Sequence, residues 1–131
     1  MSYDQKLMDR CISHALANPI KSRGRTSISR MAALLANENH KYQFSGWNKY
    51  KTHPLMYQFS KDHNKICLHA EIDVLLQLIG WTGQYTGVLN LTNWDIYVAR
   101  VLKDGTPALA KPCDTCMGAL NYFGIRNIYH T

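Results

Sequence analysis

The spacing of apolar residues along the first part of the chain predicts one helix followed by two strands. Residues 4–17 carry apolar side chains three and four positions apart, which is typical of one buried helix face, and Asn18-Pro19 ends this helix. Residues 29–36 contain an uninterrupted apolar run that predicts a buried strand. Residues 42–47 alternate between polar and apolar types and predict the returning strand of a hairpin.

The second part of the chain predicts two further helix–strand pairs after a polar segment over 48–65. A largely apolar helix runs over 72–80, and a strand follows at 95–103. A second helix is expected over 113–123, with Gly124 as its C-terminal stop, before a final strand at 125–129. This order predicts an α/β fold in which helices cover a mixed sheet of about four to five strands.

Composition indicates a single globular domain over residues 1–131. The chain is 46% hydrophobic and 18% charged, which is typical of a folded chain rather than a disordered one. No apolar segment approaches the length of a membrane span, and residues 1–6 lack the apolar core of a signal peptide. The four cysteines suggest no disulfide framework, so we expect a cytoplasmic protein in a reducing environment, without a membrane partner.

The net charge of +6 gathers partly in one segment, at Lys21, Arg23, Arg25 and Arg30. Such a segment can hold a phosphate of a nucleotide or of a nucleic-acid backbone. It can equally be a solvated loop after the first helix. The sequence leaves both interpretations open.

Three residues of the chain have the types and spacing of a catalytic zinc site. His69 precedes the 72–80 helix, and Cys113 and Cys116 lie one turn apart at the start of the later helix, directly after Pro112. Together they supply three of the four ligands that zinc prefers and leave one position for water. Alternatively, the two cysteines form a redox pair or half of a structural zinc site.

Glu71 lies two positions after His69, a spacing at which helical side chains diverge. It is therefore poorly placed as a fourth ligand, but it can reach a water in the open position. We expect Glu71 to accept a proton from that water and to pass protons on to the group that the water attacks. The alternative is a solvated carboxylate that stabilises the first turn of its helix.

The combined pattern, His69-Ala70-Glu71 followed by Pro112-Cys113-Asp114-Thr115-Cys116, resembles the signature of zinc-dependent nucleobase deaminases. From residue 29 to 129 the chain is similar to the cytidine and deoxycytidylate deaminase zinc-binding family, in the compact form often found in phage genomes. This resemblance implies the three-layer α/β/α cytidine deaminase-like fold and one Zn²⁺ per chain. It also implies a homo-oligomer, because the chain stops after its last predicted strand and a neighbouring subunit would complete the pocket.

The resemblance further suggests residues that contact substrate. Gly46-Trp47-Asn48 matches the family's Gly-x-Asn, whose asparagine hydrogen-bonds the substrate, and Ala70 lies between the ligand and the catalytic glutamate. Trp47 can stack on a base, or can belong to the strand core. His53 can contact a base or phosphate, or can cap a turn. Cys67, His53 and His63 can form a second metal site, or can simply be part of a polar loop. Trp81 and Trp94 are expected to be packing residues.

The first functional hypothesis is zinc-dependent deamination of a cytosine nucleoside or nucleotide, with deoxycytidylate (dCMP) as the favoured substrate. A second hypothesis is a nucleic-acid deaminase that acts on single-stranded DNA or tRNA. A third is a catalytically silent zinc-binding module, which would have no use for Glu71 beside the open position. The motif alone does not choose between cytosine and adenine, because pocket shape decides this.

Overall fold

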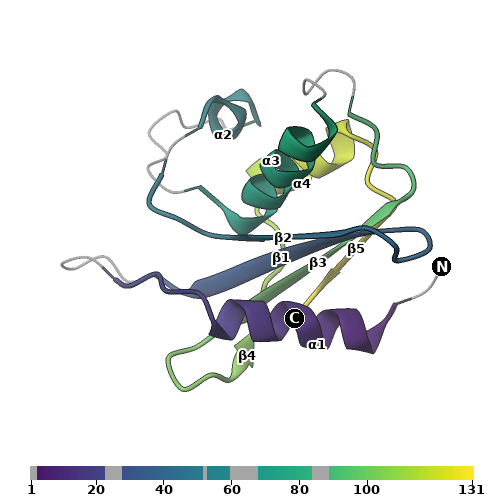
Figure 1. Ribbon diagram of the computed structural model, residues 1–131. Helices are drawn as coiled ribbons and strands as arrows, with labels where there is room; N and C mark the ends of the chain where they lie inside the picture. Colours follow the sequence, from purple (N-terminus) through teal and green to yellow (C-terminus); the bar gives the residue numbers. More distant parts are fainter. Residues whose placement is uncertain (1–2, 23–27, 52, 60–67, 84–88) are drawn as a thin grey trace.

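The structure is a computed structural model that describes residues 3–22, 28–51, 53–59, 68–83 and 89–131. Its elements follow the predicted order, with two short additions (Figure 1). In chain order they are α1 (Gln5–Leu16), β1 (Arg30–Asn37), β2 (Gln43–Trp47), α2 (Pro54–Phe59), α3 (Ala70–Thr82), β3 (Trp94–Val101), β4 (Pro107–Ala108), α4 (Asp114–Tyr122) and β5 (Asn127–His130).

The strands form one five-stranded mixed sheet in which β3 has the central position. Strands β2, β1 and β3 are antiparallel neighbours, and β5 runs parallel to β3 along its other side. The two-residue strand β4 pairs antiparallel with the end of β3, at Arg100 and Val101. The predicted mixed sheet of four to five strands is therefore confirmed.

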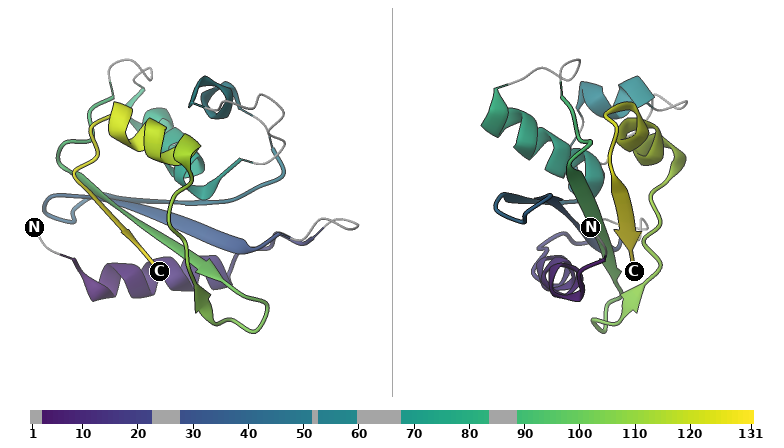
Figure 2. Two further views of the ribbon diagram at one scale, coloured as in Figure 1. Left: turned by 180° about the vertical axis from the view of Figure 1, so that it is seen from behind. Right: turned by 90° about the vertical axis from the view of Figure 1, so that its right-hand side faces the viewer.

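Helices cover both faces of this sheet, so the predicted three-layer α/β/α arrangement is also confirmed. Figures 1 and 2 show α1 on one face, and α3 and α4 on the other. The apolar run in β1 explains why two layers are needed. Ala32 and Leu34 pack toward α1, whereas Ala33 and Leu35 pack toward α3 and α4. A strand that is buried on both faces is apolar at consecutive positions rather than at alternate ones.

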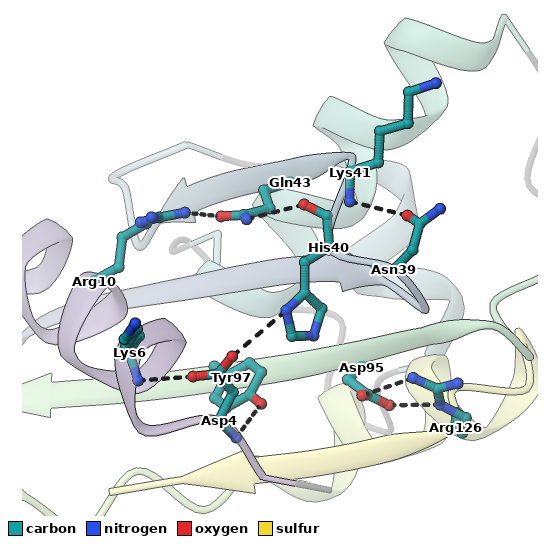
Figure 3. A network of polar contacts seen from close by, with 10 residues as sticks. All are labelled: Asp4, Lys6, Arg10, Asn39, His40, Lys41, Gln43, Asp95, Tyr97 and Arg126. Atoms are coloured by element: carbon teal, nitrogen blue, oxygen red, sulfur yellow. Dashed lines mark hydrogen bonds and ion pairs between the residues drawn. The ribbon is translucent and has the colours of Figure 1, made fainter. Parts of the chain in front are cut away.

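Polar contacts attach the start of α1 to the sheet (Figure 3). The Asp4 backbone N–H donates to the Tyr97 hydroxyl at 2.9 Å, and the Asp4 carboxylate accepts from the Lys6 backbone N–H at 2.9 Å. The same carboxylate lies 3.5 Å from the His40 ring in the β1–β2 turn. Arg126, directly before β5, forms two 2.9 Å hydrogen bonds with the buried carboxylate of Asp95 in β3.

Two short elements were not predicted. Residues 48–65 were interpreted as a polar connection, but Pro54–Phe59 forms α2, and its Leu55 and Met56 are buried in the core. Proline suits the first position of a helix, where no amide donor is needed. Strand β4 was missed because two residues carry no readable period.

Trp81 packs at the edge of the core and stays largely exposed. It was expected to be a packing residue, and 57% of its surface is exposed at the end of α3. Its ring contacts Tyr42 and Phe44 at centroid distances of 5.1 and 5.4 Å, so it covers the edge of the core from outside. Trp94 is half-buried and also packs against the core as expected.

Within the described part of the chain, no helix combines the length and apolar character needed to cross a bilayer.

Candidate metal centre

The fold brings the starts of two helices together on one face of the sheet. His69 is the N-cap residue of α3, Cys113 is the N-cap residue of α4, and Cys116 follows in the first turn of α4. Their potential ligand atoms all lie within 4.8 Å of one another. The three residues that the sequence assigned to zinc therefore form one cluster, although 44 positions separate His69 from Cys113.

The distances in this cluster fit tetrahedral zinc. With Zn–S bonds of about 2.3 Å and Zn–N bonds of about 2.0–2.1 Å, a tetrahedron places sulfur and nitrogen roughly 3.6 Å apart. The His69 Nδ1 atom lies 3.5 Å from Cys113 Sγ and 3.4 Å from Cys116 Sγ. Among the described residues, no fourth Cys, His, Asp or Glu joins the group. The donor set thus matches a catalytic zinc site that keeps one position open.

A hydrogen bond between the two cysteines shifts their pKa values in opposite directions. The hydrogen bond from the Cys116 thiol lowers the pKa of Cys113 to about 3, and the interaction with His69 contributes to this. The same hydrogen bond and burial raise the pKa of Cys116 well above its ordinary value. The lowered pKa favours the thiolate form of Cys113, which is the form that binds metal, and metal binding would require Cys116 to release its proton.

Glu71 is buried beside this cluster in the first turn of α3. Only 2% of its surface is exposed, and its Oε1 atom has no hydrogen-bond partner among the described residues. Burial raises the pKa of Glu71 above its ordinary value. The alternative of a solvated first-turn carboxylate is therefore wrong. A buried carboxylate oxygen without a partner is unfavourable unless a bound molecule satisfies it.

Glu71, His69 and Cys113 line one side of a cavity of about 450 Å³. This volume lies in the range of small-molecule sites. The rest of its wall combines apolar, amide and basic side chains, from Ile28, Ser29, Met31, Asn48, Arg100, Leu109, Ala110 and Lys111. The metal cluster and Glu71 thus face a space that can hold a nucleobase and its sugar.

Asn48 is the only one of the four suggested substrate residues among the described residues that line this cavity. Most of its hydrogen-bonding capacity is used within the protein. Its Oδ1 atom accepts from Asn18 Nδ2 at 2.7 Å and from the Met31 backbone at 3.0 Å. Its Nδ2 atom donates to the Ser29 carbonyl at 2.8 Å. Among the described residues, the second Nδ2 hydrogen has no acceptor, and its contact with a substrate stays a prediction.

The structure places the other three suggested residues away from the cavity wall. The Trp47 indole donates to the His14 carbonyl at 2.8 Å and packs with the α1-side core. The His53 Nδ1 atom accepts from the Leu55 backbone N–H at 3.0 Å and so caps α2. Ala70 is fully buried at the start of α3. Their substrate roles stay predictions. The suggested second-metal residues His63 and Cys67, like Arg23 and Arg25, lie outside the described residues.

Sequence reasoning missed the residues that position helix α3. Gly46 of β2 lies so close to α3 that a β-carbon there would be 2.6 Å from the Val74 backbone nitrogen. Asp73 is 4% exposed and accepts a hydrogen bond from the Trp47 backbone N–H at 2.9 Å. One available signal was that Asp73 is an acidic residue within a largely apolar helix. Arg100 and Ser29 of the cavity wall were also missed, because 71 positions separate them.

Comparison with known proteins identifies the fold and the zinc-binding region. The family model described as "cytidine and deoxycytidylate deaminase zinc-binding region" matches residues 1–131. No curated protein matches the chain.

Solved structures with low sequence identity share the fold. A guanine deaminase from Bacillus subtilis has a TM-score of 0.58 and 12% identity, over 99% of this chain and 64% of that one, so this chain spans just under two thirds of its length. A cytidine deaminase from Burkholderia pseudomallei has a TM-score of 0.55 and 18% identity, over 95% and 78% of the two chains. A cytidine deaminase from Mycobacterium tuberculosis has a TM-score of 0.50 and 20% identity, over 98% and 86%.

Proposed function

Because the chain belongs to the cytidine and deoxycytidylate deaminase zinc-binding family, we propose that it hydrolytically deaminates a cytosine nucleotide, with dCMP as substrate. The products are dUMP and ammonia. The reaction would supply pyrimidine nucleotides. The protein would act in the cytosol, as a homo-oligomer.

His69, Cys113 and Cys116 would hold the zinc ion. When bound, zinc supplies a Lewis acid that lowers the pKa of a water molecule in the cavity. The two thiolates neutralise the formal charge of the ion, which makes it a milder Lewis acid than one held by neutral histidines.

Glu71 moves the protons of the reaction. Its carboxylate accepts a proton from the attacking water, whose oxygen forms a bond to C4 of the cytosine ring. Glu71 then donates this proton to N3 of the ring. In the next step it accepts the remaining proton from the C4 hydroxyl group and transfers it to the exocyclic amine; the C4=O bond forms, the C4–N bond breaks, and ammonia leaves. A carboxylate whose pKa is raised by burial accepts a proton from water more readily than an ordinary one, which suits Glu71 to this transfer.

One observation carries this proposal: Glu71 lines the same cavity as His69 and Cys113, and its buried Oε1 atom has no hydrogen-bond partner among the described residues. A structural zinc site has no use for such a carboxylate. The third hypothesis, a zinc-binding module without activity, therefore does not explain why the Glu71 carboxylate is buried at this site.

Ammonia release from zinc-loaded protein tests the proposal. Cytidine, deoxycytidine, dCMP, adenosine, guanine and a short single-stranded oligonucleotide are compared, with Glu71→Gln as the inactive variant. Asp114→Asn is the matched control, because Asp114 is an exposed acid in the first turn of α4. We expect turnover of dCMP that Glu71→Gln abolishes and Asp114→Asn preserves. Turnover only of adenosine or guanine, or full activity of Glu71→Gln, would contradict the proposal.

A single-stranded polynucleotide is the second candidate substrate, and one observation favours it. A further cavity of about 400 Å³ is lined by Trp47, Lys49 and Tyr50. It shares Asn48 with the cavity that Glu71, His69 and Cys113 line, the metal cavity. Aromatic rings beside basic side chains are typical of sites that stack successive bases. Turnover of the oligonucleotide with strong dependence on salt, and none of dCMP, would favour this candidate.

A further inference from the structure

A second cavity adjoins the metal cavity across a shared wall. Its volume is about 430 Å³, close to that of the metal cavity. The two cavities have three wall residues in common, Ile28, Ser29 and Arg100. The two cavities therefore lie side by side, and a ligand whose base occupies the metal cavity would extend its other end toward these shared residues.

The second cavity is strongly basic. Four of the side chains that line it are cationic: Lys21, Arg30, Arg100 and Lys103. Its described wall contains no aspartate or glutamate, and none of the ion pairs found among the described residues uses any of the four. Cations that gather around a concave surface without a counter-charge attract an anion.

Its two guanidinium groups are held in place by neutral partners. Arg30 donates from Nη1 to the Leu16 carbonyl at 2.8 Å and from Nη2 to the Leu102 carbonyl at 3.2 Å. Arg100 donates from Nε to the Ser29 hydroxyl at 2.9 Å. Because a guanidinium has five N–H donors, both groups keep donors for a ligand. Their partners fix their positions without neutralising their charge.

Ser29 connects this basic cavity to the metal site. Its hydroxyl accepts from Arg100, and its carbonyl accepts from Asn48 at 2.8 Å. The Asn48 side chain in turn lines the metal cavity with Glu71 and His69. A chain of hydrogen bonds thus sets the spacing between Arg100 and the site at which the base would react.

We propose that Lys21, Arg30, Arg100 and Lys103 form the site that holds the phosphate of the substrate, so that the enzyme selects nucleotides over nucleosides. This inference rests on the proposed function for the placement of the base. The phosphate oxygens accept charge-assisted hydrogen bonds from the guanidinium groups and interact with the two lysines. The volume of the cavity exceeds that of one phosphate, so di- and triphosphates also fit it.

Binding measured without turnover tests the proposal independently of catalysis. Zinc-loaded Glu71→Ala protein is titrated calorimetrically with deoxycytidine, dCMP, dCTP and a five-nucleotide single strand with a central deoxycytidine. The same ligands are titrated against a version that also carries Lys21→Gln and Lys103→Gln. Both lysines are exposed and make no hydrogen bond or ion pair in the described structure, so their replacement leaves the fold intact. Lys6→Gln with Lys41→Gln is the matched control, because it removes two exposed lysines that line neither cavity.

We expect dCMP to bind at least about 10-fold more tightly than deoxycytidine, and the Lys21/Lys103 variant to lose about 10- to 100-fold of the dCMP affinity. The control pair should change it by less than about twofold, because distant surface charges are screened. Equal binding of deoxycytidine and dCMP, or equal losses in the two double variants, would overturn the proposal.

The different ligands also distinguish a failure of the phosphate site from a failure of the proposed function. Tighter binding of the single strand than of dCMP, with the same dependence on the lysines, supports the site and identifies a polynucleotide as the source of the phosphate. If dCMP binds through the lysines but the active protein releases no ammonia from it, the proposed function fails while the phosphate site stands.

Discussion

The Asp73 carboxylate of α3 accepts a 2.9 Å hydrogen bond from the backbone N–H of Trp47, at the end of β2. This contact joins two segments that contribute to the site. Asp73 lies two positions after Glu71, and Trp47 directly precedes Asn48 of the cavity wall. The same carboxylate lies 3.2 Å from Lys49 Nζ. Asp73 thereby fixes the helix that carries the proposed proton carrier against the strand end that carries Asn48.

Replacement of Asp73 should destabilise the fold more than replacement of its cationic partner. Asp73→Ala leaves the Trp47 N–H without its acceptor in a half-buried place, which should cost about 1–3 kcal/mol. The Lys49 side chain is 42% exposed, so solvent screens its ion pair and Lys49→Ala should cost less than about 1 kcal/mol. Urea unfolding of both variants measures the two free energies. Equal losses would show that the ion pair, not the backbone contact, holds α3.

Gly46 should tolerate no side chain, because β2 and α3 are in direct backbone contact there. A β-carbon at this position would lie 2.6 Å from the Val74 nitrogen and 3.0 Å from the Ala70 carbonyl oxygen. Gly46→Ala should therefore lower the free energy of unfolding by several kcal/mol or prevent folding. Gly80→Ala is the matched control within α3, since a β-carbon there meets nothing within 4 Å. It should stabilise the protein by about 0.5–1 kcal/mol, because alanine favours the helix. Thermal unfolding that shifts equally in both variants would contradict this account of the contact.

The sequence predicted most of what depends on local patterns, and little of what depends on distant partners. The apolar run in β1 and the ligand spacing at Cys113 and Cys116 were readable because each lies within one segment. Helix α2 was not readable, because its stability depends on burial of Leu55 and Met56 in the core. The position of Arg100 was likewise hidden, since its partner Ser29 lies on another segment and approaches only in the folded sheet.

Loss of one zinc ligand should lower both zinc content and thermal stability. Zinc that binds the folded chain raises its melting temperature in proportion to the logarithm of its concentration over its dissociation constant. Cys113→Ala and Cys116→Ala should therefore lose the zinc found in the wild type by mass spectrometry and no longer respond to a chelator in thermal unfolding. Cys11→Ala is the matched control, because Cys11 belongs to the buried side of α1, on the opposite face of the sheet. Full zinc content in either ligand variant would show that the cluster is not the metal site.

Cys11 should make the protein less stable at alkaline pH. Its side chain is fully buried and its Sγ lies 3.4 Å from the carbonyl oxygens of Ala32 and Tyr97. Burial raises the pKa of Cys11 to about 12, whereas a thiol in an unfolded chain titrates near 8.5. A raised pKa contributes stability that is complete below the unfolded value and is lost as the pH rises from about 8.5 toward 12.

The unfolded state therefore gains free energy by releasing the Cys11 proton, at up to about 1.4 kcal/mol per pH unit within this window. Other groups titrate in the same range, so the difference between wild type and Cys11→Ala isolates the thiol. Urea unfolding at pH 7.5 and at pH 10 should show a larger loss of stability in the wild type than in Cys11→Ala. Parallel losses in the two proteins would mean that the buried thiol does not control the alkaline limit; Tyr97, whose pKa burial also raises, is then the next group to replace.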